Sequence, residues 1–349
     1  MSIFDRSQGD TPSVSRRALL GGGLTVAATA ALAGCSKTAA GGTAAAAGET
    51  PIKGKKVIAV VHEMNSFFPP VQKGFEMFGK AVGWETQFMG PPTFDQAAVV
   101  TMMQNAINAK PDGLILTRID ETSYDEVIKK ATAAGIPVIL TNVASKGYEK
   151  LGVGFVGQDF VPAGVIAGEQ ILKHVTKAGR KDGAIIIGKI QAGNSALEER
   201  GEGIRKAIDE HNSKNGTSFA AEDLIVGTDE AKAIAKINDR YARDPGSVAG
   251  WAGTAFECQF VATWAKSKDL VGKFSNGGFD MTKPVLAGIK AGSIDFTIGQ
   301  NPWAQGWVAA ALIAQQIHPG YPSFHYDTGA EVVDASNIDK VTDREAKLA

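Results

Sequence analysis

The sequence contains few of the residue types that mark several common protein classes. Its two cysteines, Cys35 and Cys258, exclude a small domain held together by disulfides. Its 36 lysines and arginines are matched by 37 aspartates and glutamates, so it lacks the basic excess of nucleic-acid binding proteins. Its 44% hydrophobic content excludes a disordered chain. A length of 349 residues is enough for two lobes, each with its own core.

The common catalytic signatures are missing as well. No predicted strand runs into GxGxxG or GxxxxGKS, and neither GxSxG nor HExxH occurs. The histidines lack the spacing of metal ligands; they are His62, His174, His211, His318 and His325. We therefore expect no enzyme activity, no metal and no cofactor. An exported enzyme is a disfavoured alternative, because it would need a nucleophile or a metal centre that the sequence does not offer.

The N-terminal residues carry export signals. Arg16 and Arg17 precede a short apolar run rich in Ala and Gly, which is typical of a twin-arginine signal peptide and too short for a stable membrane span. LAGC, ending at Cys35, resembles a lipobox, in which the cysteine is diacylated and becomes the new N-terminus. An ordinary secretory signal with a coincidental cysteine is the alternative. We predict a signal peptide over residues 1–34 and a lipid anchor at Cys35, in the periplasm or on the outer face of the cell membrane.

The composition of the chain after Cys35 changes near Ile52. Residues 35–51 are low in complexity and lack large apolar side chains, so we predict a tether rather than part of a folded core. From Ile52 onward, short runs rich in Val and Ile alternate with stretches of helical spacing. Runs that are apolar throughout indicate parallel strands covered by helices on both faces. Two successive βαβ series predict an α/β protein with two doubly wound parallel-sheet lobes.

Polar and aromatic residues follow several predicted strands, where doubly wound sheets bind their ligands. They are Asn65, Phe67 and Phe68 after KVIAVV, Asn142 ending PVILTN, Arg200 in NSALEERGEG, Asp280 ending SNGGFD and Gln300 ending TIGQ. Sugar hydroxyls both donate and accept, so they suit amides, a carboxylate and a guanidinium. Aromatic faces pack against the C–H faces of a sugar ring. The set therefore predicts a neutral polyhydroxylated ligand.

Each of these residues also has a purely structural interpretation. Arg200 could pair with Glu198 or Glu202 on a solvated helix face. Asp280 could cap the helix before MTKPVLAG, and Asn142 and Gln300 could be turn residues.

Three local expectations follow from neighbouring residues. We expect one ring of Phe67 and Phe68 to face the ligand and the other to pack inward, with the two prolines that follow starting a helix. Asn194 or Ser195 is expected to cap the helix that carries Arg200. Cys258 is expected to be a small buried core residue.

Five motifs, in order and at similar spacing, resemble the ribose-binding protein family: NSFFPPVQKG, IPVILTN, GNSALEERGEG, GGFD and TIGQNP. These proteins are the periplasmic substrate-binding proteins of ABC sugar importers, and the likeness covers roughly residues 54–330. The resemblance implies a monosaccharide held between two lobes joined by three hinge crossings, residues 52–157 plus 301–328 and residues 158–300 plus 329–349. It places Asn65, Phe67, Phe68 and Asn142 in the first lobe, Arg200 and Asp280 in the second, and Gln300 at a crossing.

The chain also departs from that family. Ribose binders have Asp-Arg where this chain has Asn142-Val143, whereas glucose and galactose binders have Asn there, which favours a hexose or a related polyol. The usual Asn-Asp after SVAGWAGT is absent; Thr254 is the nearest polar substitute and Glu257 a weaker one. Asn194 and Trp303 are candidate pocket walls, although Trp303 shares a helix face with Trp307 and core packing is its favoured role.

The resemblance implies a monomeric, lipid-anchored receptor that captures a hexose, a pentose or a related polyol. It would deliver this sugar to the membrane subunits of an ABC permease without any chemistry. A furanosyl signalling molecule or a nucleoside remains open as the ligand, and a chemotaxis sensor remains open as the role. A soluble repressor of the same fold is disfavoured, because the N-terminus offers an export signal instead of a DNA-binding motif.

Overall fold

The computed structural model describes residues 51–348. The predicted signal peptide, Cys35 and the tether before Pro51 lie outside the described residues. Among residues 51–348, none of the helices has both the length and the apolar character needed to cross a membrane.

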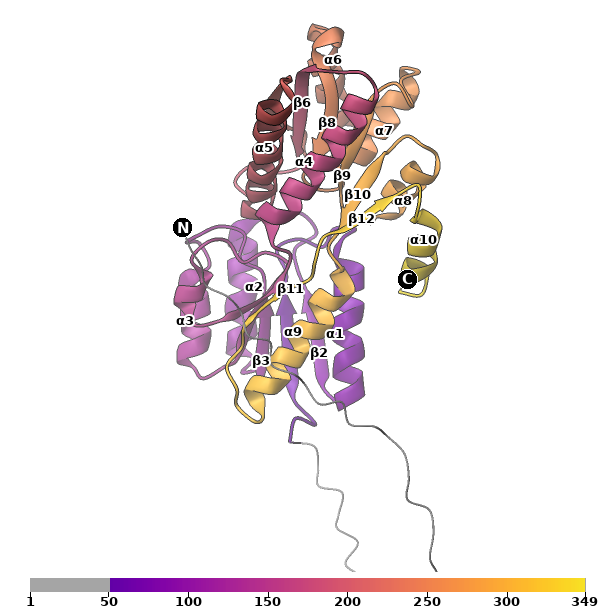
Figure 1. Ribbon diagram of the computed structural model, residues 1–349. Coiled ribbons are helices and arrows are strands. Elements are labelled where there is room, and N and C mark those ends of the chain that lie inside the picture. Colours follow the sequence, from indigo (N-terminus) through magenta and orange to yellow (C-terminus); the bar gives the residue numbers. More distant parts are fainter. Residues whose placement is uncertain (1–50, 349) are drawn as a thin grey trace, which may run out of the picture. The chain divides into compact units, whose positions relative to one another are not determined.

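Two six-stranded sheets organise residues 51–348 (Figure 1). The first has the order β11-β5-β4-β3-β1-β2 and the second the order β12-β10-β9-β8-β6-β7. All neighbouring strands run parallel except β12, which is antiparallel to β10. The prediction of two doubly wound parallel-sheet lobes is confirmed.

Most strands coincide with predicted apolar runs, whereas β11 and β12 match none and β7 begins earlier than its run. The first sheet contains β1 (Lys56–Val60), β2 (Glu85–Met89), β3 (Gly113–Leu116), β4 (Val138–Thr141), β5 (Gly154–Gly157) and β11 (His325–Asp327). The second contains β6 (Asp182–Lys189), β7 (Ser218–Ile225), β8 (Val248–Gly253), β9 (Ser275–Phe279), β10 (Phe296–Gly299) and β12 (Glu331–Asp334). The central strands are buried along their whole length, as expected for sheets covered on both faces.

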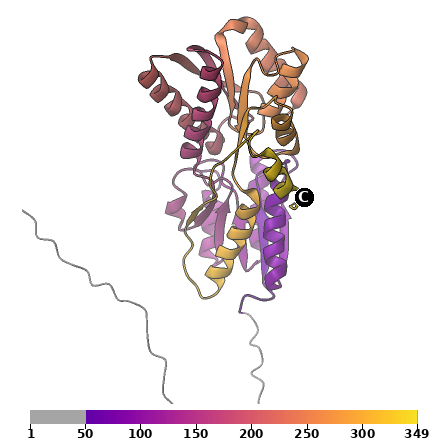
Figure 2. The same cartoon turned by 45° about the vertical axis from the view of Figure 1, so that its right-hand side comes forward.

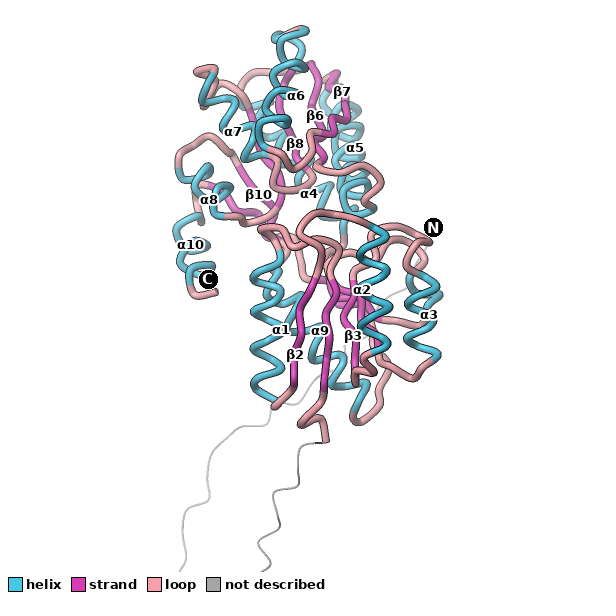
Figure 3. The backbone as a smooth tube through the Cα atoms, turned by 180° about the vertical axis from the view of Figure 1, so that it is seen from behind, coloured by secondary structure: helices cyan, strands magenta, loops and turns pink. Residues whose placement is uncertain are grey.

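Helices cover both faces of each sheet, as Figures 1 and 3 show from opposite sides. On the first sheet, α1 (Phe68–Val82) and α9 (Pro302–Ile317) pack on one face, and α2 (Gln96–Asn108) and α3 (Asp125–Ala133) on the other. On the second sheet, α4 (Phe160–Lys177) and α5 (Ser195–Asn215) form one layer. The opposite layer contains α6 (Glu230–Arg243), α7 (Cys258–Ser267), α8 (Lys283–Lys290) and α10 (Ile338–Ala346).

Several helix starts and core positions match the sequence. Two prolines, Pro69 and Pro70, occupy the first turn of α1, as predicted. The side chain of Asn194 caps α5 by accepting a hydrogen bond from the N–H of Ala196. Cys258 is fully buried in the core of the second lobe, also as predicted.

The chain passes between the two lobes at three places within residues 51–348. These crossings lie between β5 and α4, between β10 and α9, and between β11 and β12 (Figure 2). Because both sheets are parallel, the C-terminal ends of their strands lie at the edges that the crossings join.

Candidate functional site

A hollow of about 50 Å³ lies where the strand ends of the two sheets meet. It is lined by eight of the residues selected from the sequence: Asn65, Phe67, Phe68, Asn142, Asn194, Arg200, Asp280 and Gln300. Further wall residues were not selected: His62, Val143, Phe160, Ile190, Ala196, Leu197, Ala255 and Phe256. The structure thus brings strand-end residues of both lobes to one place.

Asn142 and Asp280 occupy equivalent positions in the two sheets. Each follows a central strand, and each has a left-handed backbone, with φ of 64° and 70°. The N–H of Asn142 donates to the carbonyl of Val156 (3.0 Å), and that of Asp280 donates to the carbonyl of Ile298 (3.1 Å). Asn and Asp tolerate this conformation better than other non-glycine residues. Both strands therefore end in the same sharp turn, which directs one polar residue from each lobe to the hollow.

Arg200 is the buried cation of the site, with 3% of its surface exposed. Its Nε and Nη2 donate to Oε1 of Gln158 (3.1 and 2.8 Å), and its Nη1 donates to the carbonyl of Thr254 (2.9 Å). Its guanidinium also lies 4.2 Å from the ring centre of Phe279 and 5.2 Å from that of Phe160. Planar contacts and directed hydrogen bonds hold the side chain in one orientation.

The backbone around Arg200 is fixed as tightly as its side chain. Gly164 of α4 lies directly against the carbonyl of Arg200, and a side chain at position 164 would clash with it. The alternative in which Arg200 pairs with Glu198 or Glu202 is wrong. Instead, Glu198 pairs with Lys189 (2.5 Å), and Glu202 pairs with Lys146 (3.7 Å).

Two buried carboxyl groups lie near Arg200. Asp280 accepts a hydrogen bond from Nε2 of Gln300 (2.6 Å). Burial raises the pKa of Asp280, while Arg200 and Gln300 oppose that rise. Burial raises the pKa of Glu257 to about 8 and lowers the pKa of Arg200 to about 10. Of the two carboxyl groups, Asp280 is therefore the one whose ionised form the charge of Arg200 favours.

A chain of side-chain amides connects the two lobes at this site. Nδ2 of Asn142 donates to Oε1 of Gln305 (3.2 Å), and Nε2 of Gln305 donates to Oε1 of Gln300 (3.1 Å). Gln300 in turn donates to Asp280. Asn142 in the first lobe is thus connected to Asp280 in the second by a chain of hydrogen bonds in which each amide donates to the next residue.

The two phenylalanines have different depths. Phe68 is 1% exposed and packs edge-on against His62, at 5.3 Å between ring centres. Phe67 is 8% exposed and stands at 89° to Phe68. Asn65 supports this loop, since its Oδ1 accepts the N–H of Phe67 (3.0 Å). Phe67 is therefore the ring better placed to contact a ligand, and Phe68 packs beneath it.

The structure does not bring Thr254 or Glu257 to the hollow, contrary to the sequence-based prediction, and Trp303 packs against Trp307 as favoured. Thr254 donates its hydroxyl to the carbonyl of Gly188 (2.7 Å). The carboxyl group of Glu257 accepts the N–H groups of Thr254 (2.7 Å) and Ala255 (3.0 Å). Both residues therefore fix the backbone at Thr254, whose carbonyl accepts the hydrogen bond from Arg200. Trp303 stacks on Trp307, with 5.0 Å between ring centres, and lines a separate hollow beside β12.

Four of the unselected residues bear on what the sequence can predict. Gln158 follows β5 directly, so the strand-end rule that selected Asn142 would also have found it. Phe160 opens the next helix, and His62 directly follows the first apolar run. Gln305 lies inside α9, where no sequence signal separates it from a core position. These residues hold or wall the hollow.

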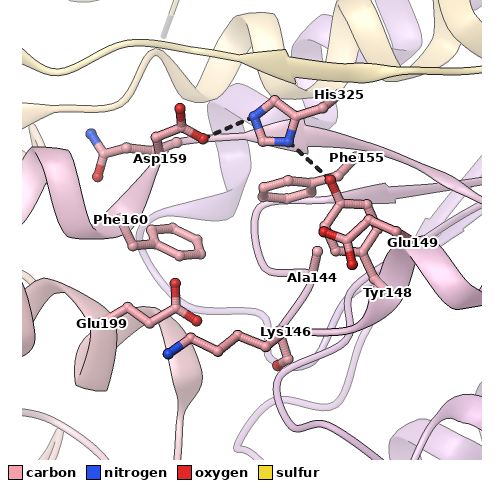
Figure 4. A pocket seen from close by; sticks show the side chains of 11 residues that line it. Ala144, Lys146, Tyr148, Glu149, Phe155, Asp159, Phe160, Glu199 and His325 are labelled. Atoms are coloured by element: carbon pink, nitrogen blue, oxygen red, sulfur yellow. Dashed lines mark hydrogen bonds and ion pairs between the residues drawn. The ribbon is translucent and has the colours of Figure 1, made fainter.

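A larger hollow of about 380 Å³ adjoins the first and shares Phe160 with it (Figure 4). In it, the hydroxyl of Tyr148 lies 3.0 Å from Nδ1 of His325, and Nε2 of His325 lies 2.9 Å from Oδ1 of Asp159. Glu199 faces the same space, and burial raises its pKa. Phe160 therefore separates an inner from an outer compartment. Within residues 51–348, no group of three or more His, Cys, Asp or Glu side chains is arranged to hold a metal ion.

A family profile for the periplasmic binding protein domain matches residues 56–320. The chain belongs to this family. Periplasmic binding proteins bind and release their ligands without chemistry, in line with the expectation of no enzyme activity.

Individual relatives support the assignment. The chain is 26% identical over 302 residues to the xylose/arabinose-binding protein XylF of Sulfolobus acidocaldarius, which covers 81% of this chain and 72% of that protein. It is 24% identical over 267 residues to the ribose import binding protein RbsB of Bacillus subtilis, covering 73% and 78% of the two chains. The resemblance to ribose-binding proteins is thereby confirmed.

Among solved structures, a similar one is an ABC transporter solute binding protein from Agrobacterium vitis with bound D-fucose. The TM-score is 0.74 and the identity 26%, with 84% of this chain and 99% of that chain covered. The related sequences and the similar structure are therefore all binding proteins.

Proposed function

We propose that this periplasmic binding protein captures a neutral monosaccharide or polyol between its lobes and delivers it to an ABC permease. The observation that carries the proposal is the single hollow lined by Phe67 and Asn142 from the first lobe and by Arg200 and Asp280 from the second. The relatives described above are named for xylose, arabinose and ribose, and the similar structure holds D-fucose. Export and lipid anchoring at Cys35 are part of the same proposal, supported by the sequence alone.

The described arrangement corresponds to a closed receptor. Hydroxyl groups of Ser145 and Ser195, from opposite lobes, lie 2.7 Å apart. A hollow of about 50 Å³ has room for only a few water molecules, so the described lobes are closed further than they are around a sugar, which enters a more open form and keeps the hollow wider. The lobes then close by rotation at the crossings.

Closure explains how such a site selects its sugar. Once water is excluded, each hydroxyl of the ligand must meet a protein partner. A buried polar group left without a partner costs about 1–3 kcal/mol. Because the guanidinium of Arg200 and the turn at Asp280 are fixed, a sugar epimer with one hydroxyl reversed cannot regain its hydrogen bond. We therefore expect affinities to differ among epimers by about tenfold or more.

Calorimetric titration with a panel of neutral hexoses, pentoses and polyols tests the proposal. We expect at least one member to bind with a dissociation constant in the micromolar range or tighter, and its epimers to bind more weakly. Mass spectrometry of small molecules released from the purified protein identifies a ligand outside the panel, such as a nucleoside. A chain that binds no panel member and releases no sugar would refute the proposal.

Asp280→Asn is expected to weaken sugar binding by about 10- to 150-fold, because hydrogen bonds to a charged group contribute about 1.5–3 kcal/mol each. Asparagine retains the left-handed turn, so the backbone should stay in place. Asp295→Asn is the matched control, since Asp295 lies before β10, away from the hollow, and burial raises its pKa too. Calorimetry should show unchanged affinity in the control. If the two variants bound sugar with equal affinity, Asp280 would not be a ligand-binding residue.

A further inference from the structure

Lysines gather at the end of the first sheet opposite the hollow. The strands there are parallel, so their first residues, and the loops before them, share one edge. Five lysines lie at this edge, in the loops before the strands, at the first residue of β1 or in the last turn of α1: Lys53, Lys55, Lys56, Lys80 and Lys110. We call this set the basic end. Lys80 lies in the last turn of α1 and Lys110 between α2 and β3.

Most of this charge is unbalanced. Lys55 pairs with Asp112 (3.1 Å) and Lys56 approaches Glu85 (3.9 Å). Lys53, Lys80 and Lys110 are exposed, and within the described chain they form no ion pair within 4 Å. The basic end is therefore positive in a chain whose formal net charge is −1.

The corresponding end of the second lobe is rich in cations as well. Its helices carry Lys177, Arg240, Arg243, Lys266 and Lys290 in their last turns, where the helix dipole favours positive charge. The basic end is therefore distinguished by what lies beside its lysines, and not by the number of lysines.

Two of the most exposed large apolar side chains in the described residues lie on the segment after α9. Tyr321 is 65% exposed and Phe324 is 51% exposed. Ile52 and Ile317, the last residue of α9, pack against the same apolar cluster of the first lobe. A hollow of about 730 Å³, lined by Lys110 and Ile317 among others, lies at this end too. Rings beside lysines are typical of surfaces that contact lipid headgroups.

The preceding chain joins the fold at the same end. Nε1 of Trp84 donates to the carbonyl of Ile52 (2.7 Å), which fixes the entry of the chain beside the start of β2. The fifty residues before Pro51, with Cys35 among them, therefore connect to the basic end and not to the hollow.

We propose that the basic end binds the anionic lipid surface to which the chain is tethered. The inference rests on the proposed lipid anchoring at Cys35, which would hold this end near the membrane. The strand ends of the first sheet would then face away from the membrane, toward the second lobe. Sixteen residues separate Cys35 from Ile52, a span of at most about 60 Å, which lets the receptor leave the lipid and turn toward a permease.

Vesicle sedimentation tests the inference with the chain carrying Cys35→Ser, which cannot be lipidated. Vesicles contain phosphatidylcholine alone or a mixture with phosphatidylglycerol. We expect binding to the anionic vesicles only, decreasing as salt is added. The triple variant Lys53→Glu, Lys80→Glu, Lys110→Glu should bind at least about 100-fold more weakly, since each lysine near such a surface contributes about fivefold.

The matched control changes the same charge elsewhere. Lys181→Glu, Lys214→Glu and Lys268→Glu, all exposed in the second lobe, should leave vesicle binding unchanged within about threefold. Equal loss in both triple variants, or no preference for anionic vesicles, would overturn the inference. Sugar calorimetry on the same variants keeps the two proposals apart. Both triples should bind sugar normally, and vesicle binding without any sugar binding would refute only the proposed function.

Discussion

Replacing Arg200 with methionine is expected to abolish measurable sugar binding and to lower the free energy of unfolding by about 3–5 kcal/mol. The substitution leaves Oε1 of Gln158 and the carbonyl of Thr254 without their donors. It also leaves the buried Asp280 without its countercharge. Calorimetry measures the affinity, and urea denaturation measures the stability. Arg200→Lys should lose most of the affinity as well, because an ammonium group cannot reproduce the planar set of donors.

Arg205→Met provides the matched control on the same helix. Arg205 is 37% exposed and pairs with Asp223, and an exposed ion pair contributes about 1 kcal/mol or less. This variant should therefore bind sugar normally and lose little stability. Near-native affinity in Arg200→Lys or Arg200→Met would exclude Arg200 from ligand binding. Circular dichroism separates loss of binding from loss of the fold.

His62 should make the ligand-free protein less stable in acid, by about 3 kcal/mol between pH 7 and pH 4. Burial lowers the pKa of His62 from 6.5 to about 4, and its Nδ1 is buried without a hydrogen-bond partner. Over this interval the unfolded chain binds a proton at His62 that the folded chain excludes. Stability from this group is therefore complete above pH 6.5 and is lost as the pH falls toward 4.

Urea denaturation at a series of pH values measures this effect as a difference between variants. Glu257 has the opposite sign, because its raised pKa of about 8 lowers stability as the pH rises from 4.5 toward 8. Subtracting the curve of His62→Phe from that of the native chain removes such shared contributions. His318→Phe is the control, since His318 is exposed. A pH dependence that is unchanged in His62→Phe would show that His62 carries no such effect.

The fold follows from the sequence because the signal recurs along the chain. Buried strands such as β3 and β4 are apolar at every position, and parallel sheets require this pattern. Strand ends were equally readable: Asn142, Asp280 and Gln300 were selected because they end apolar runs, and they line one hollow. Gln158 meets the same rule, because it directly follows β5.

Other features depend on contacts that no local pattern encodes. Thr254 and Glu257 also follow a strand, yet they face inward and hold the backbone behind Arg200. Gln305 resembles any helix residue until the fold brings Asn142 and Gln300 to it. Strand-end position therefore predicts that a residue is near the site, whereas the direction of its side chain is decided by packing.

A crystal structure of the protein with a tightly bound sugar tests the central claim most directly. The account predicts one sugar in the inner hollow, with Arg200 and Asp280 bonded to its hydroxyls from the second lobe. Asn142 and Phe67 should contact the same molecule from the first lobe. A sugar that touches one lobe only, or that occupies the outer compartment beyond Phe160, would contradict it.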